Sequence, residues 1–113
     1  MRISVAIATL SLAASIALPQ SRSFSGQIMD SQCAGMGSHA QMMQGVGAKT
    51  AKECTVKCVQ LGGKYTLFDT SAKTAYLLDN QDKAAAFAGQ KVTVKGTLDA
   101  ASKTIKVESI AAQ

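Results

Sequence analysis

The residues best suited to chemistry gather in the first half of the chain. They are three cysteines and the only histidine, Cys33, His39, Cys54 and Cys58. Three thiolates and one imidazole form a common tetrahedral ligand set for zinc, so the spacing Cys-x5-His and Cys-x3-Cys predicts a metal site. Sulfur ligands also suit copper(I), and three methionines flank the histidine, at Met36, Met42 and Met43. The expected metal is therefore zinc or copper.

A disulfide is the alternative for the same cysteines, because an exported protein meets an oxidising compartment. A bond from Cys54 to Cys58 within one helix would be strained. The candidate disulfide therefore joins Cys33 with Cys54 or Cys58, and closing a loop of about 20–24 residues stabilises by about 3 kcal/mol. It leaves one free thiol, whereas the metal site uses every thiol. Either cross-link requires the three cysteines to meet in space, with His39 near them.

No catalytic arrangement stands out in the sequence. Thioredoxin-like enzymes use Cys-x-x-Cys, and this chain has Cys-x3-Cys instead. A Cys–His nucleophilic pair would find only Asp30 or Asn80 to orient it. The chain also lacks a phosphate loop, a dinucleotide fingerprint and a serine elbow. We therefore expect that the protein is not an enzyme and that it has no catalytic residues.

One helix is expected to position two of the cysteines. The segment Thr50–Leu61 begins with a capping box, in which Glu53 follows Thr50 by three residues. Its apolar face is expected to consist of Ala51, Cys54, Cys58 and Leu61. The glycine-rich segment before it, residues 31–48, is expected to be a loop.

Alternating apolar and polar residues predict five strands. We expect these strands at 24–30, 64–69, 74–79 and 91–98, and from 104 onward, with a short helix at 81–88. Ile110 breaks the alternation of the last strand, which predicts a bulge near Ser109. In the first hairpin, Tyr65 and Leu67 are expected to share a face with Ala75 and Leu77 on the partner strand. That assignment leaves two aromatic residues as an exposed patch, Phe68 and Tyr76.

This order of elements predicts a mainly β fold. We expect a five-stranded OB-fold-like antiparallel barrel, with one inserted helix after strand 1 and a short helix between strands 3 and 4. The insertion spans residues 31–62 as a loop and a helix. An open α+β sheet with the same strand order is the alternative.

The N-terminus carries the pattern of a secretory signal peptide over residues 1–23. Arg2 precedes an uncharged apolar run, and small residues allow cleavage after Ala17 or Ser23. The run is shorter than the roughly 20 residues that span a membrane, so no membrane span is expected after processing. We therefore expect a single OB-like domain over residues 24–113, located in the periplasm or secreted.

Several stretches of the chain resemble those of one protein family. Gly26–Cys33 reads Gly-Gln-Ile-Met-Asp-Ser-Gln-Cys, Glu53–Val59 reads Glu-Cys-Thr-Val-Lys-Cys-Val, and Gly63–Leu67 reads Gly-Lys-Tyr-Thr-Leu. Together with the closing hairpin, these runs resemble an uncharacterised family of small secreted bacterial OB-fold-like proteins. The resemblance implies that fold and an exported location, and it implies no activity.

The charge pattern excludes some partners. Without residues 1–23, ten lysines face seven acidic residues, and the lysines are scattered along the chain. Nucleic-acid binding usually needs a concentrated basic patch, so no nucleic acid is expected. The leading expectation is an exported, non-enzymatic binding or interaction module for an unknown protein or small ligand in the cell envelope. The alternative is a periplasmic metal-binding protein that uses the cluster of three cysteines and one histidine.

Overall fold

The computed structural model describes residues 20–37, 43–45 and 47–113. Its strands are β1 (Arg22–Asp30), β2 (Tyr65–Asp69), β3 (Thr74–Leu78), β4 (Lys91–Asp99) and β5 (Thr104–Ala112). Its helices are α1 (Ser31–Met36), α3 (Ala51–Gln60) and α4 (Gln81–Ala85). Most of the expected signal peptide, up to residue 19, and His39 lie outside the described residues. Within the described ranges, no helix combines the length and apolar character needed to cross a membrane.

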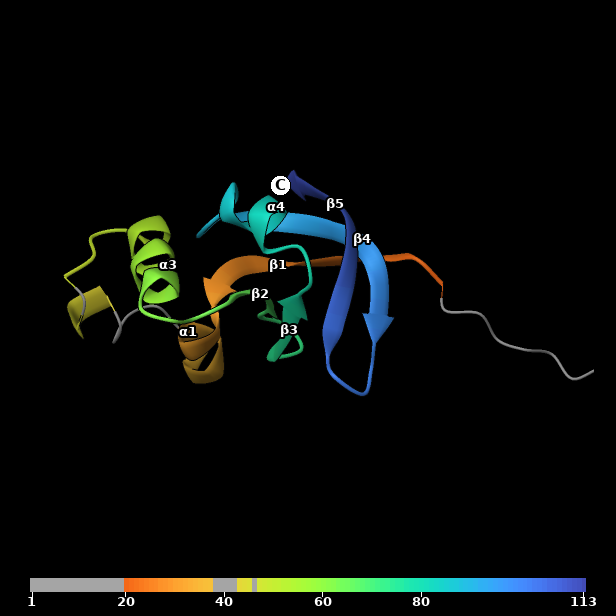
Figure 1. The fold of residues 1–113 in the computed structure, drawn as a ribbon, viewed down its shortest axis with the longest axis horizontal. Coiled ribbons are helices and arrows are strands. Elements are labelled where there is room, and N and C mark those ends of the chain that lie inside the picture. The colour runs from red at the N-terminus through yellow and green to blue at the C-terminus, as the bar shows by residue number, and fades with distance from the viewer. Residues whose placement is uncertain (1–19, 38–42, 46) are drawn as a thin grey trace, which may run out of the picture.

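The five strands form one mixed sheet that closes into a ring in the order β1-β2-β3-β5-β4 (Figure 1). Four neighbouring pairs are antiparallel, and β3 pairs with β5 in parallel, with Leu77 opposite Thr104. The expectation of a wholly antiparallel arrangement was therefore wrong. The reason is parity, because directions that alternate around an odd number of strands leave one pair parallel. The alternative of an open sheet is also wrong, because the ring closes.

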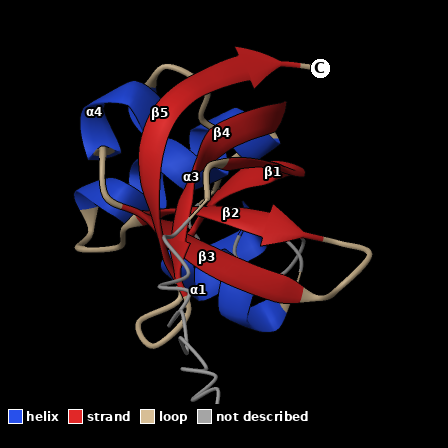
Figure 2. Cartoon of the chain, turned by 90° about the vertical axis from the view of Figure 1, so that its right-hand side faces the viewer, coloured by secondary structure: helices blue, strands red, loops and turns tan. Residues whose placement is uncertain are grey.

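Strand β1 is long enough to pair with both of its neighbours, β4 and β2, along different parts of its length. Its first part pairs with β4 from Arg22 to Gln27, and its second part pairs with β2 from Gln27 to Asp30. It begins at Arg22, two residues before the expected strand. Figure 2 shows the strands curving around one another, with helices beside them. Strand β1 leads directly into α1, so the end of the ring positions that helix.

Two local predictions are confirmed in detail. Helix α3 starts after Thr50, whose hydroxyl accepts a hydrogen bond from the Glu53 amide at 3.1 Å. The Glu53 carboxylate reaches back past the N-cap and accepts from the Lys49 amide at 2.8 Å, so the reciprocal bond involves the residue before Thr50 and not Thr50 itself. In the last hairpin, Lys95 pairs with Ser109 whereas Gly96 pairs with Val107, which places the bulge at the intervening residue of β5.

Residues 31–48 were expected to form a loop, and part of this segment is helical instead. Helix α1 occupies Ser31–Met36, because the Asp30 carboxylate caps it by accepting from the amides of Gln32 and Cys33 at 3.0 and 2.9 Å. Gly37 ends it with a φ of 73°, in the left-handed region that favours glycine. A helix this short is defined by the signals at its two ends and has no room for a repeated apolar pattern. Hydrophobic periodicity in the sequence therefore did not indicate it.

The expected orientation of β3 was wrong by one residue. Leu67 lies opposite Tyr76, so Tyr76 and Leu78 face the ring interior, and Leu78 is 1% exposed whereas Leu77 is 39% exposed. The predicted exposed aromatic patch is absent for two reasons: this register turns Tyr76 inward, and Phe68 on the other face of β2 is buried against the cysteine-bearing helices. Phe68 is 5% exposed, and the Tyr76 ring packs against that of Phe24 with centroids 5.5 Å apart.

The buried side chains form two clusters. The first, called the ring core here, lies inside the strand ring and includes Phe24, Ile28, Tyr65, Leu67, Leu78, Ala84, Ala88, Val92, Val94 and Ile105. The second, called the cysteine cluster, includes Met29, Cys33, Ala34, Ala48, Cys54, Cys58 and Phe68. Leu61 belongs to neither and is 76% exposed, because α3 ends at Gln60 and the chain turns away from the apolar face there.

Candidate metal centre

Two helices bring the three cysteines together. Cys33 lies in the first turns of α1, and Cys54 and Cys58 lie one turn apart on α3. Their exposed fractions are 0%, 0% and 2%, so all three side chains point into the protein. The capping of α1 by Asp30 and of α3 by Thr50 sets where each helix begins, and so which face carries its cysteines.

The three sulfur atoms lie within 4.8 Å of one another, and those of Cys33 and Cys54 are 3.6 Å apart. All three residues are free thiols in this structure. A zinc–sulfur bond of about 2.3 Å would place the sulfurs of a regular tetrahedron about 3.8 Å apart. The three buried cysteines are therefore close enough to hold a metal ion. His39, the fourth predicted ligand, lies outside the described residues.

Asp30 is a site residue that the sequence suggested only as a possible orienting partner for a Cys–His pair. Its side chain is fully buried and forms a hydrogen bond with the Cys33 thiol, in addition to capping α1. Gly63 packs against it closely, since a Cβ there would lie 2.7 Å from the Asp30 Oδ2 atom. The signal was present in the sequence, because an aspartate three residues before Cys33 at the end of a strand is a typical N-cap.

Burial and Asp30 both raise the pKa values of the Cys33 and Cys58 thiols, which favours their protonated forms in the metal-free protein. Burial raises the pKa of the Cys33 thiol, and the hydrogen bonds to Asp30 and Cys54 raise it further. Burial also raises the pKa of the Cys58 thiol, with the negative charge of Asp30 as the next cause. Thiols of this kind are poor nucleophiles, because the thiolate is the reactive form.

The surroundings of the thiols are apolar. Met29 and Phe68 are buried beside them, and Met43 and Ala75 pack against the cluster from outside. The described lysines and arginines are all exposed, so none of them is buried among the thiols. The sulfur atoms therefore lie in a buried, largely apolar pocket where a net charge is costly.

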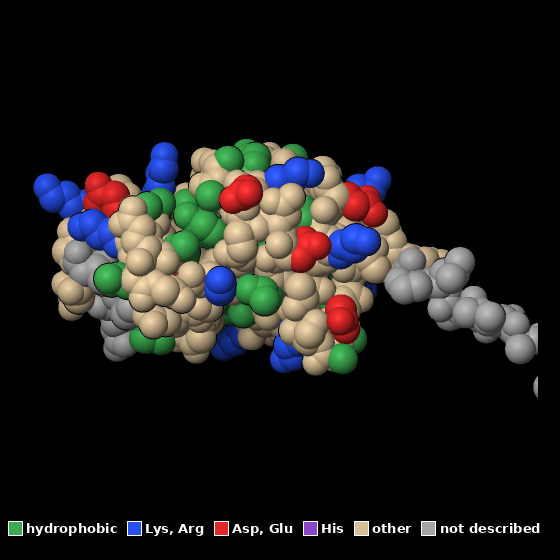
Figure 3. All heavy atoms as spheres, in the orientation of Figure 1, with side chains coloured by type: hydrophobic (Ala, Val, Ile, Leu, Met, Phe, Trp, Pro, Cys, Tyr) green, Lys and Arg blue, Asp and Glu red, His purple; other side chains and the backbone are tan. Residues whose placement is uncertain are grey.

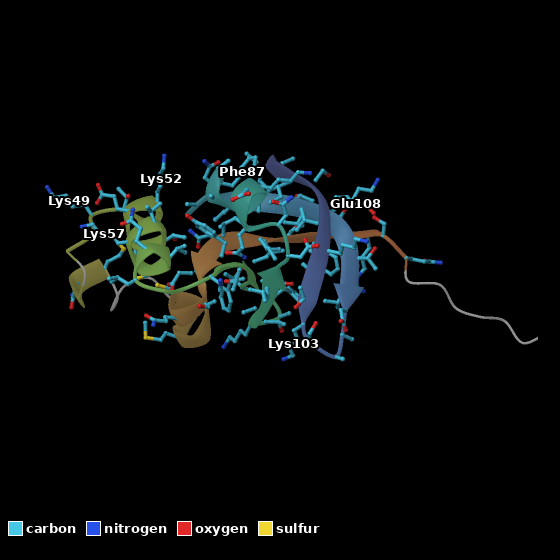
Figure 4. The ribbon with its side chains drawn as sticks, viewed as in Figure 1. Lys49, Lys52, Lys57, Phe87, Lys103 and Glu108 are labelled. Atoms are coloured by element: carbon cyan, nitrogen blue, oxygen red, sulfur yellow. The ribbon has the colours of Figure 1, made fainter. Side chains whose placement is uncertain are left out.

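The opposite face of α3 is basic and solvated. Lys49, Lys52 and Lys57 point outward from α3 and the segment before it (Figure 4), and the surface there shows several lysine side chains (Figure 3). All three residues are exposed. The helix thus separates a charged outer face from an inner face that carries the thiols.

The comparisons with known proteins concern mainly the strands. A family model described as "Protein of unknown function (DUF5818)" matches residues 58–113, slightly less than half of the chain. No curated protein and no solved structure matches. The match begins at Cys58 and leaves Cys33 and Cys54 outside it. From Cys58 to the C-terminus, the chain is thus similar to an uncharacterised family.

Proposed function

We propose that this chain is an exported protein that binds one thiophilic metal centre through Cys33, Cys54 and Cys58. The observation that carries the proposal is the mutual separation of the three buried sulfur atoms, all within 4.8 Å. Sulfur ligands select soft or borderline centres, among them zinc and copper(I), over hard cations such as magnesium. The two helices already hold the sulfurs together without an ion, so little ordering is needed on binding.

We further propose that the strand ring is an OB-like barrel that serves as a rigid scaffold. The strand order, the parallel contact of β3 with β5 and the helix between β3 and β4 support this assignment. The two cysteine-bearing helices then form the insertion between β1 and β2. Ligands held by helices that a barrel supports are positioned better than ligands on free loops.

Export is proposed from the N-terminal pattern, and the start of β1 favours one of the two cleavage sites. Cleavage after Ser23 would remove Arg22 and Ser23, which pair with Gly96 and Lys95 of β4. It would also remove a guanidinium that lies 4.7 Å from the centre of the Phe24 ring. We therefore expect cleavage after Ala17, with Leu18 as the mature N-terminus. Intact-mass measurement of exported protein tests this, and a chain that starts at Met1 or Phe24 would contradict it.

A binding module that works without a metal has less support. The aromatic residues that would have formed its binding face, Phe68 and Tyr76, are buried and half-buried. The proposed function therefore rests on the cysteines rather than on the barrel surface.

Thiol counting tests the metal proposal against a disulfide. Protein isolated from the envelope without reductant, then denatured with a chelator present, should show three titratable thiols under the metal proposal. A disulfide would leave one. Cys58→Ala is the matched variant: the metal proposal expects two thiols in it, whereas a Cys33–Cys54 disulfide expects none. One thiol in the wild type and none in the variant would overturn the proposal.

A further inference from the structure

The described residues offer three donors to a metal centre and no suitable fourth. Asp30 is the carboxylate beside the thiols, but its Oδ1 and Oδ2 atoms already accept from the amides of Cys33 and Gln32 at 2.9 and 3.0 Å. Among the described histidine, cysteine and acidic side chains, the three cysteines form the only group of three or more whose ligand atoms lie within 4.8 Å of one another. A zinc site normally has four ligands. The geometry therefore suits a centre that is complete with three sulfurs.

The net charge of the occupied site further restricts which metal or metalloid it can hold. Three thiolates leave one excess negative charge around Zn²⁺ and two around Cu⁺, and the Asp30 carboxylate is already buried beside them. Every described lysine and arginine is exposed, so none is buried beside the thiols to offset that charge. Burying an uncompensated charge in an apolar pocket is costly. The thioethers of Met29 and Met43 favour copper(I) by softness, but they do not reduce the excess charge. A trivalent centre, in contrast, is neutralised by three thiolates.

Resting on the proposed function, we infer that this site binds a trivalent, three-coordinate metalloid, with arsenic(III) as the probe, taken up as its neutral trihydroxide. Three arsenic–oxygen bonds break and three arsenic–sulfur bonds form. Each thiol proton leaves on one hydroxide as water, so three waters are released. Arsenic stays trivalent, no oxidant or reductant is needed, and no net charge enters the pocket. The lone pair on arsenic occupies the fourth position, where none of the described histidine, cysteine or acidic side chains supplies a competing ligand.

The test compares arsenite, Zn²⁺ and Cu⁺ on the reduced, metal-free mature protein under anaerobic conditions. We expect arsenite to bind at one equivalent per chain, to remove all three thiols from titration, and to bind more tightly than Zn²⁺ or Cu⁺. Replacing any one of Cys33, Cys54 or Cys58 by alanine should weaken arsenite binding more than about 100-fold, beyond the effect of outer-shell partners. The thiol count on the wild type stands without these variants, should one fail to fold.

Two control variants distinguish the alternatives. Asp30→Asn keeps a side-chain oxygen that caps α1 but removes a negative charge beside the thiols, so it should leave arsenite affinity nearly unchanged and strengthen any binding of Zn²⁺. His39→Ala should leave arsenite affinity unchanged. The inference is overturned if arsenite consumes only two thiols, if His39→Ala abolishes its binding, or if Zn²⁺ or Cu⁺ binds more tightly. Tight binding of Zn²⁺ or Cu⁺ would leave the proposed function standing, whereas binding of none of the three would overturn both.

Discussion

The ring core and the cysteine cluster are built from different side chains. Branched aliphatic residues from all five strands fill the ring core, including Ile28, Leu67, Leu78, Val94 and Ile105, each at most 1% exposed. The cysteine cluster contains mainly cysteine, alanine and methionine from α1, α3 and the segments around them, with one aromatic residue, Phe68. Each buried methylene group contributes about 0.8 kcal/mol, so small residues contribute less per position. The strand ring can support itself, whereas the cluster gains more from a cross-link or a bound centre.

The largest expected effect comes from removing β4 and β5. A chain truncated before Gln90 loses both strands, and β1 and β3 become open edges with the ring core exposed between them. We expect complete loss of cooperative thermal unfolding, measured by circular dichroism. Cooperative melting of the truncated chain would show that the cysteine cluster folds without the ring. The cluster, and not the ring core, would then be the self-supporting region.

A matched pair of substitutions compares the two clusters directly. Leu67→Ala in the ring core should lower the free energy of unfolding by about 2–5 kcal/mol, through lost burial and a cavity. Cys54→Ala in the metal-free protein removes one sulfur atom and should cost clearly less, below about 2 kcal/mol. Urea denaturation of both reduced proteins measures the difference. Equal losses would mean that the cluster is a second full core.

The pH dependence of the metal-free protein should come from the cluster and not from the ring core. The raised pKa values of Cys33 and Cys58 favour the folded state while the thiols stay protonated. This stability is present below the ordinary thiol pKa of about 8.5 and is lost as pH rises above it, by up to about 1.4 kcal/mol per unit per thiol. Unfolding at pH 7 and pH 9.5 measures it. Leu67→Ala should retain the pH dependence, and the double variant Cys33→Ala/Cys58→Ala should lose it.

The smallest expected effect concerns the ends of α3. Thr50→Ala removes the N-cap and should cost about 1 kcal/mol. Leu61→Ala, at an exposed position after the helix, should change stability by less than about 0.5 kcal/mol. Denaturation curves of the two variants check this order. A larger loss of stability for Leu61→Ala than for Thr50→Ala would indicate that Leu61 packs on the apolar face of the helix, as its spacing predicted.

Features with a local cause were predictable from the sequence alone. The capping box at Thr50 and Glu53 predicted where α3 begins, and the broken alternation at Ile110 predicted the bulge in β5. Both depend on residues within a few positions of one another, whose hydrogen bonds form in any context that allows the element. The parallel contact of β3 with β5 also follows from the strand count once the ring closes.

Features with a non-local cause needed the tertiary structure. The side of β3 that faces inward depends on register with β2, which places Tyr76 rather than Leu77 in the interior. The distance of 3.6 Å between the sulfurs of Cys33 and Cys54 depends on the packing of two helices from separate parts of the chain. Residue types alone indicated which side chains could bind a metal. The folded chain decided that three thiols meet in an apolar pocket beside a buried carboxylate, because only packing determines solvent exposure and neighbouring charge.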